Sequence, residues 1–256
     1  MSVVDTLVSL SRTLGDPTHD LAILAEGNAS ARDGETFWVK ASGFQMATLD
    51  RDGLVQVDLQ RATRLLDGHD LTDQDTRQAL KDVRIDRESE RLPSVETFMH
   101  AYLLTLTDVN FVGHTHPTPL LSLLATQRAE WIAGKRLFPD EIVCCGPQTA
   151  FVPYVDPGLP LAKAIRTSVD RYIRRWEETP KTIWLQNHGL IALGKSPREV
   201  ESATQMSVKA ARVWLGALSS GQELHPLGEE QVKRIHTRPD EHYRQRLLWQ
   251  IQGTTE

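Results

Sequence analysis

Hydrophobic residues recur along this chain of 256 residues with spacings that predict both strands and helices. The run TFWVK at 36–40 is β-branched and aromatic, and the Asp-Gly pair in the preceding RDGE predicts a turn, so we expect a hairpin near the N-terminus. Apolar residues at helical spacing predict amphipathic helices over 92–106, with Pro93 in the first turn, and over 159–177. Charge clusters dominate 60–91, which predicts a solvated loop with short helical pieces.

A second group of elements surrounds the histidines. VNFVGHTH at 109–116 predicts a buried strand that ends in a His-x-His pair, and PLLSLLATQRAEWIA at 119–133 predicts one helix after it. KTIWLQNHGLIALG at 181–194 predicts two apolar strands joined by a tight turn at 187–189. SPREV at 196–200 is typical of a helix start. Because helices and strands alternate with no linker or repeat between two halves, we expect one α/β domain.

Composition and charge narrow the class of partner. The chain is 40% hydrophobic with a net charge of -5, so it offers no electrostatic argument for nucleic acid or an anionic membrane, and small molecules are the expected partners. The N-terminus lacks the features of a signal peptide, and no stretch approaches the ~20 apolar residues of a membrane span, so we expect a cytoplasmic location. The adjacent cysteines Cys144 and Cys145 are expected to be plain buried thiols.

The two histidines at the end of the predicted strand are candidate metal ligands. Side chains alternate along a strand, so His114 and His116 face one side while Thr115 faces the other. The pair alone also fits two neighbouring histidines without a ligand, and a metal site needs a third donor. His188, between two apolar strands, is either that donor or a plain turn residue. Three neutral imidazoles with an open position describe a catalytic zinc or a related divalent ion.

Four motifs in this order resemble the class II aldolase/adducin family, which includes fuculose-phosphate and rhamnulose-phosphate aldolases. They are GNAS at 27–30 with KASG at 40–43, PSVE at 93–96, HTHP at 114–117 and NHG at 187–189. The resemblance implies a three-layer αβα fold with a central, largely antiparallel sheet, usually in a homotetramer with active sites at subunit boundaries. We expect a single domain over 1–256 with a C-terminal extension from about residue 217, which covers either a neighbour's active site or the protein's own surface.

The same resemblance implies roles for individual residues. His114, His116 and His188 match the ligands of a divalent metal, with Zn²⁺ as the first choice, and Glu96 matches the carboxylate that acts as acid and base. Glycine and small hydroxyl residues suit an anion site, because backbone N–H groups must approach the anion closely. The residues that match the phosphate-binding segments are Asn28, Ser30, Ser42, Gly43 and Ser94.

The chain departs from the family pattern at two places. Val95 stands where the aldolases often have a second serine, which raises the prospect of an unphosphorylated or differently bound substrate. The stretch after the metal pair, in which the aldolases carry an acid that serves a neighbouring subunit, offers Phe138, Asp140 and Glu141, so the proton donor is unassigned. Tyr154 is interpreted as a packing residue and His100 as a helix-face residue.

These matches predict a metal-dependent aldolase, a carbon–carbon lyase of carbohydrate metabolism. It is expected to cleave a ketose, taken as phosphorylated, into a dihydroxyacetone-type fragment and an aldehyde through a metal-stabilised enediolate, with Glu96 moving a proton at a pKa raised by the partly apolar pocket. The alternatives on the same scaffold are a sugar-phosphate epimerase, a dehydratase or a sugar-acid-phosphate decarboxylase, followed by a non-catalytic adducin-like scaffold. The complete histidine set argues against the scaffold.

Overall fold

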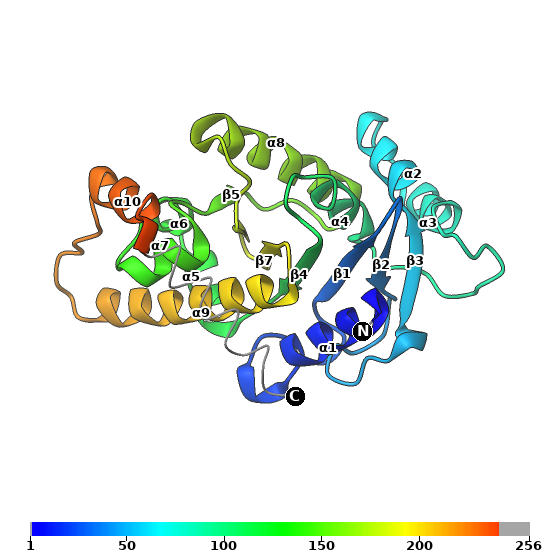
Figure 1. The fold of residues 1–256 in the computed structure, drawn as a ribbon, viewed down its shortest axis with the longest axis horizontal. Helices are drawn as coiled ribbons and strands as arrows, with labels where there is room; N and C mark the ends of the chain where they lie inside the picture. The colour runs from blue at the N-terminus through cyan, green and yellow to red at the C-terminus, as the bar shows by residue number, and fades with distance from the viewer. Residues whose placement is uncertain (1, 241–256) are drawn as a thin grey trace.

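A central seven-stranded sheet lies between two layers of helices in the computed structural model, which describes residues 2–240 (Figure 1). The strand order is β3-β2-β1-β4-β7-β6-β5, and all neighbours are antiparallel except β5 and β6. The strands are β1 (Asn28–Asp33), β2 (Thr36–Lys40), β3 (Leu54–Asp58), β4 (Phe111–Thr115), β5 (Ala150–Val152), β6 (Thr182–Leu185) and β7 (Gly189–Gly194). The predicted αβα fold with a largely antiparallel sheet is confirmed.

The helices divide between the two faces of the sheet. In Figure 1, α1 and α9 lie below the sheet, while α2, α4 and α8 lie above it. The helices are α1 (Val3–Leu14), α2 (Leu59–Arg64), α3 (Asp73–Asp82), α4 (Thr97–Leu103), α5 (Thr118–Leu124), α6 (Ala129–Ala133), α7 (Pro139–Cys145), α8 (Leu159–Trp176), α9 (Pro197–Ser219) and α10 (Glu229–His236). None of the helices in this described part of the chain combines the length and apolar character that crossing a bilayer requires.

Alternation along β1 sends its side chains to different layers. Ala29 and Ala31 pack into the apolar core between the sheet and α1, so Asn28 and Ser30 face the α4 side. The antiparallel register pairs Asn28 with His114 of β4. Two polar residues of the GNAS motif are therefore buried against the end of the strand that carries the histidine pair.

The helix predicted over 92–106 is wrong in its first part, because α4 begins only at Thr97. Residues 92–94 are extended along the end of β2: the Ser42 N–H donates to the Leu92 carbonyl and the Ser94 N–H to the Lys40 carbonyl. Pro93 forms a β-bridge in this segment instead of entering the helix. The backbone groups of this segment find their partners on β2, and the residue before a proline disfavours the helical region.

The single helix predicted over 119–133 is also wrong, because it is divided into α5 and α6. The Thr126 hydroxyl donates to the Leu123 carbonyl and accepts from the Arg128 N–H, which gives the backbone an alternative to the helix between them.

Other expectations hold. The strand over 36–40, the helix from 159 and the turn between β6 and β7 are confirmed, and the charge-rich stretch contains the short helices α2 and α3. Cys145 is buried, but Cys144 is only half-buried, so the expectation of two buried thiols is wrong for Cys144.

The first part of the predicted C-terminal extension lies on this chain's own surface. Val232 and Ile235 of α10 pack against Ile142 of α7. The end of the extension, 241–256, lies outside the described residues.

Candidate metal centre and its cavity

Three imidazoles meet where β4 ends. The Nε2 atom of His114 lies 3.0 Å from Nε2 of His116 and 3.3 Å from Nε2 of His188. Within residues 2–240, these three form the only group of three or more histidine, cysteine, aspartate or glutamate side chains close enough to share a metal ion. The same nitrogen of each ring points to a common position, which is the arrangement a divalent ion requires.

The β6–β7 turn brings the third histidine to the pair. The His188 N–H donates to the Leu185 carbonyl, and Asn187 takes the left-handed conformation at φ 53° that this short turn needs. Gly189 follows, and a Cβ at that position would lie 2.5 Å from the Thr115 carbonyl oxygen and 2.8 Å from Cδ2 of His116. Only glycine lets the turn approach the pair this closely.

The histidines are held in the form that binds metal. Nδ1 of His114 lies 3.0 Å from the Leu190 carbonyl and donates to it, so the lone pair of His114 is on Nε2 and faces the other rings. Burial lowers the pKa of His114 and of His116 to about 4, so both rings are neutral at neutral pH. The donor set therefore fits a divalent metal.

The Glu96 carboxylate lies beside the three rings, at the residue before α4. Its Oε1 is 3.2 Å from Nε2 of His188, and its Oε2 is 3.4 Å from Nε2 of His114 and accepts a 2.8 Å hydrogen bond from Asn28. Burial alone raises the pKa of Glu96, but the charge that His114 carries when protonated and the hydrogen bonds from His188 and Asn28 outweigh burial and hold that pKa below its ordinary value. The expectation of a raised pKa is wrong, and the carboxylate is ionised at neutral pH.

A cavity of about 240 Å³ opens beside this centre. Glu96, His116 and His188 contribute to its wall. Four of the five residues predicted to bind phosphate line it as well: Asn28, Ser42, Gly43 and Ser94.

Ser30, the fifth, is absent from that wall. It is fully buried, and its Oγ lies 2.7 Å from Nδ1 of His100. His100 is also fully buried, so its interpretation as a plain helix-face residue is incomplete: it belongs to the polar interior around Glu96.

Lys40 also lines the cavity, although it was not among the site residues predicted from the sequence. Its side chain is only 2% exposed, and Nζ donates to the Phe44 carbonyl at 2.6 Å and lies 3.4 Å from the carbonyls of Ala25 and Ala41. Burial lowers the pKa of Lys40, and the negative charge of Glu96 opposes that shift. The available signal was its place as the last residue of TFWVK and the first of KASG.

The candidates for the missing acid do not line this cavity. Glu141 is buried on α7, where it accepts from the Leu137 N–H and lies 3.6 Å from Arg136. Tyr154 is 54% exposed and donates to Asp156, so its interpretation as a packing residue is wrong.

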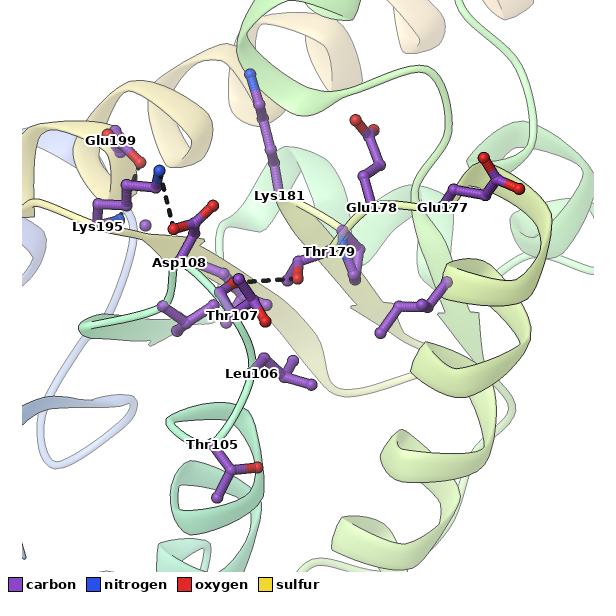
Figure 2. Close-up of a pocket in the computed structure, with 15 residues that line it drawn as sticks. Thr105, Leu106, Thr107, Asp108, Glu177, Glu178, Thr179, Lys181, Lys195 and Glu199 are labelled. Carbon is purple, nitrogen blue, oxygen red and sulfur yellow. Dashed lines mark hydrogen bonds and ion pairs between the residues drawn. The ribbon is translucent and has the colours of Figure 1, made fainter. Parts of the chain in front are cut away.

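A second cavity, of about 600 Å³, lies at the opposite end of β4 and β7 (Figure 2). Two pairs of polar groups bind each other across it: Lys195 lies 2.9 Å from Asp108, and the Thr179 hydroxyl donates to the Thr107 carbonyl. It contains no histidine and no group of metal-binding side chains among the described residues, so the smaller cavity is the candidate site.

This chain is similar to known proteins over most of its length. The family described as Class II Aldolase and Adducin N-terminal domain matches residues 5–215. A curated relative, "Uncharacterized oxidoreductase YuxG" of Bacillus subtilis (strain 168), is 26% identical over 216 residues, which are 82% of this chain and 29% of that protein. The chain thus spans less than a third of that relative's length.

Solved structures share the fold. The N-terminal class II aldolase domain of a conserved protein from Thermoplasma acidophilum is 28% identical with a TM-score of 0.65, covering 84% of this chain and 94% of that one. An L-fuculose 1-phosphate aldolase is 18% identical with a TM-score of 0.66, covering 91% of this chain and 94% of that one, and this likeness shows the fold alone.

Proposed function

We propose that this chain, which belongs to the class II aldolase and adducin family, is a metal-dependent aldolase. It would cleave a phosphorylated ketose into a dihydroxyacetone-type fragment and an aldehyde. The observation that carries the proposal is the meeting of three imidazoles and an ionised Glu96 carboxylate beside one cavity. A homotetramer in the cytoplasm, built from one domain with a C-terminal extension, remains part of the proposal.

His114, His116 and His188 would hold the divalent ion, and Zn²⁺ is the first choice because it commonly takes three protein ligands with one open position. When bound, the ion supplies Lewis acidity that stabilises negative charge developing on substrate oxygens as the carbon–carbon bond breaks.

Glu96 would move the proton at the carbon beside the substrate carbonyl. Its Oε2 is occupied by the Asn28 N–H. Its buried Oε1 faces Nε2 of His188 at 3.2 Å, and that nitrogen would have no proton to donate once it binds the ion. An ionised oxygen without a donor is suited to take a proton from carbon and return it.

The polar residues of the cavity wall support an anionic substrate group. Ser94 Oγ accepts from Asn28 Nδ2 at 3.2 Å and from the Glu96 N–H at 3.3 Å, so its own proton is available to a ligand. Gly43, at φ 84°, is exposed at the cavity, and Lys40 adds a buried positive charge. We assign Asn28, Ser42, Gly43, Ser94 and Lys40 to a phosphate site, and we leave Ser30 out of it because Ser30 does not line the cavity.

A second candidate is a related reaction on an unphosphorylated or differently bound substrate, by an epimerase, a dehydratase or a decarboxylase. Val95 favours it, because this side chain is 44% exposed at the cavity rim where a hydroxyl would add a donor to the phosphate.

Hydrogen exchange tests the proposal directly. Zinc-loaded protein is incubated with dihydroxyacetone phosphate in deuterium oxide, and loss of the hydroxymethyl proton is followed by NMR. We expect exchange by the wild type, no exchange by His116→Ala, and no exchange by Glu96→Gln despite its full zinc content. Exchange retained by Glu96→Gln would refute its role, and a zinc-loaded wild type without exchange would favour the second candidate.

A further inference from the structure

We propose that His100 is a positioning residue: a chain of hydrogen bonds from Ser30 through His100 to Asn28 determines which oxygen of Glu96 is left to move the proton. The inference rests on the function proposed for Glu96 and extends it to two residues with no contact to the cavity.

The chain of hydrogen bonds is continuous and shielded from water. Ser30 Oγ lies 2.7 Å from Nδ1 of His100, Nε2 of His100 is hydrogen-bonded to Oδ1 of Asn28, and Nδ2 of Asn28 donates to Oε2 of Glu96 at 2.8 Å. Ser30 and His100 are 0% exposed, and Asn28 and Glu96 are 4% and 6% exposed. Water therefore has little access to replace a lost bond.

Secondary structure brings the four residues together. Asn28 and Ser30 are two apart on β1 and face the same layer, while His100 follows Glu96 by four residues, so both lie on one side of α4 and its first turn. Each of these two β1 side chains therefore has a hydrogen-bond partner in the α4 segment: Asn28 binds Glu96, and Ser30 binds His100.

The direction of every bond follows from the carboxylate. An ionised carboxylate only accepts, so Asn28 must present its amide N–H groups to Glu96 and its Oδ1 to His100. Nε2 of His100 must then carry a proton. Burial lowers the pKa of His100 to about 4, so the ring is neutral, its lone pair is on Nδ1, and the Ser30 hydroxyl donates to it.

The consequence appears at Glu96. The oriented amide occupies Oε2 and leaves Oε1, which has no donor once Nε2 of His188 binds the ion, to act on the substrate. Without the Nε2 proton of His100, Oδ1 of Asn28 loses its donor, and only the two acceptors of Nδ2, Glu96 and Ser94, favour this orientation of an amide whose O and N ends have nearly the same shape. The reversed amide would place Oδ1 against the carboxylate and repel it. Ser30 thus acts through His100 and not as a phosphate ligand.

The first test measures the tautomer of His100 by nitrogen-15 NMR of the zinc-loaded protein with labelled histidine. We expect a neutral ring protonated on Nε2, and we expect Ser30→Ala to shift it toward the Nδ1-protonated form. Ser207→Ala is the matched control, because Ser207 is likewise buried and hydrogen-bonded but lies on α9. A wild-type ring protonated on Nδ1, or a cation, would overturn the proposal.

The second test separates orientation from folding. His100→Met removes the donor at similar size, and we expect kcat for the proton exchange to fall about 10–100-fold with KM and zinc content nearly unchanged. His100→Gln keeps an amide N–H for Asn28 and should recover most of that loss. Equal losses in the two variants, or wild-type kcat in His100→Met, would contradict the proposal.

Two controls keep the outcomes distinct. If His100→Met does not fold, as judged by circular dichroism, the tautomers of the wild type and Ser30→Ala still decide the question. If the wild type exchanges no proton of dihydroxyacetone phosphate, the proposed function fails on this substrate, whereas the tautomer measurement still supports or overturns the hydrogen-bond chain.

Discussion

Lys40 and Glu96 are buried charges of opposite sign that face one cavity. A buried ammonium is costly unless it is paired, and here three backbone carbonyls and the field of Glu96 compensate it in part. An anionic group of the substrate would complete that compensation.

We therefore expect Lys40→Met to raise KM for dihydroxyacetone phosphate about tenfold or more, with a smaller change in kcat, because the lost charge acts in binding. Steady-state exchange rates measured against substrate concentration provide the check. Lys81→Met, at an exposed lysine of α3, is the matched control. A KM equal to that of the wild type would remove Lys40 from the anion site.

The buried imidazoles also make stability depend on pH. The pKa of His100 is about 4 in the folded protein, against an ordinary value of 6.5. Between these values the unfolded chain binds a proton that the folded chain does not, so stability falls as pH falls through this window. His114 and His116 act in the same direction.

For the metal-free protein, we expect the free energy of unfolding to drop between about pH 7.5 and about pH 5, with His100 contributing on the order of 2 kcal/mol. Urea denaturation at both pH values measures this drop in the free energy of unfolding. His100→Gln has one buried imidazole fewer and should show a smaller drop. A drop as large as that of the wild type would mean that His100 does not titrate in this way.

At the scale of elements, the β6–β7 turn decides whether the third histidine reaches the pair. Gly189→Ala would drive a methyl group into the Thr115 carbonyl and the His116 ring. We expect a zinc affinity lower by about 10–100-fold, measured by competition with a chromogenic chelator. The control is Gly216→Ala on α9, which meets no atom within 4 Å and should stabilise the helix by about 0.5–1 kcal/mol. Unchanged zinc affinity in Gly189→Ala would show that the turn can shift without cost.

The start of α4 at Thr97, rather than at the predicted residue 92, is also determined at the scale of elements. The helical spacing of its apolar residues is correct, but pairing of residues 92–94 with the end of β2 pulls Ser94 and Glu96 out of the helix and toward the cavity. A periodicity confined to one segment carries no information on such pairing, because the partner strand is about fifty residues away in sequence.

At the scale of the whole molecule, exposed apolar side chains adjoin the cavity. Ile23 and Leu24 are 57% and 77% exposed, and the next two residues, Ala25 and Glu26, line the cavity. Side chains of this kind beside an active site are typical of a surface that another subunit covers.

We expect light scattering to give the mass of a tetramer for the wild type and a lower mass for Leu24→Lys, since a charge at the contact opposes association. Ile85→Lys, at an exposed apolar residue beside β3, should leave the mass unchanged. A monomeric wild type would reject the predicted homotetramer.

The sequence by itself determined the strand that carries the histidine pair and the turn that carries His188, because alternation and glycine-containing turns are properties of short segments. The αβα class followed from the family resemblance that the order of the motifs carries. It also singled out Glu96 and most of the residues that line the cavity. Ser30 was predicted as a phosphate ligand from the GNAS motif, and a sequence motif does not show which of its residues are buried.

Only the tertiary structure decided how these pieces act on one another. Strand register buried Asn28 beside His114, and the packing of α4 on β1 turned Ser30 and His100 toward each other. His114, His188 and Asn28, brought together from three places in the chain, lowered the pKa of Glu96, which an apolar neighbourhood in sequence had suggested would rise. Hydrogen bonds and electric fields act across a few ångströms of space, and residues seventy or more positions apart in the chain supply them here.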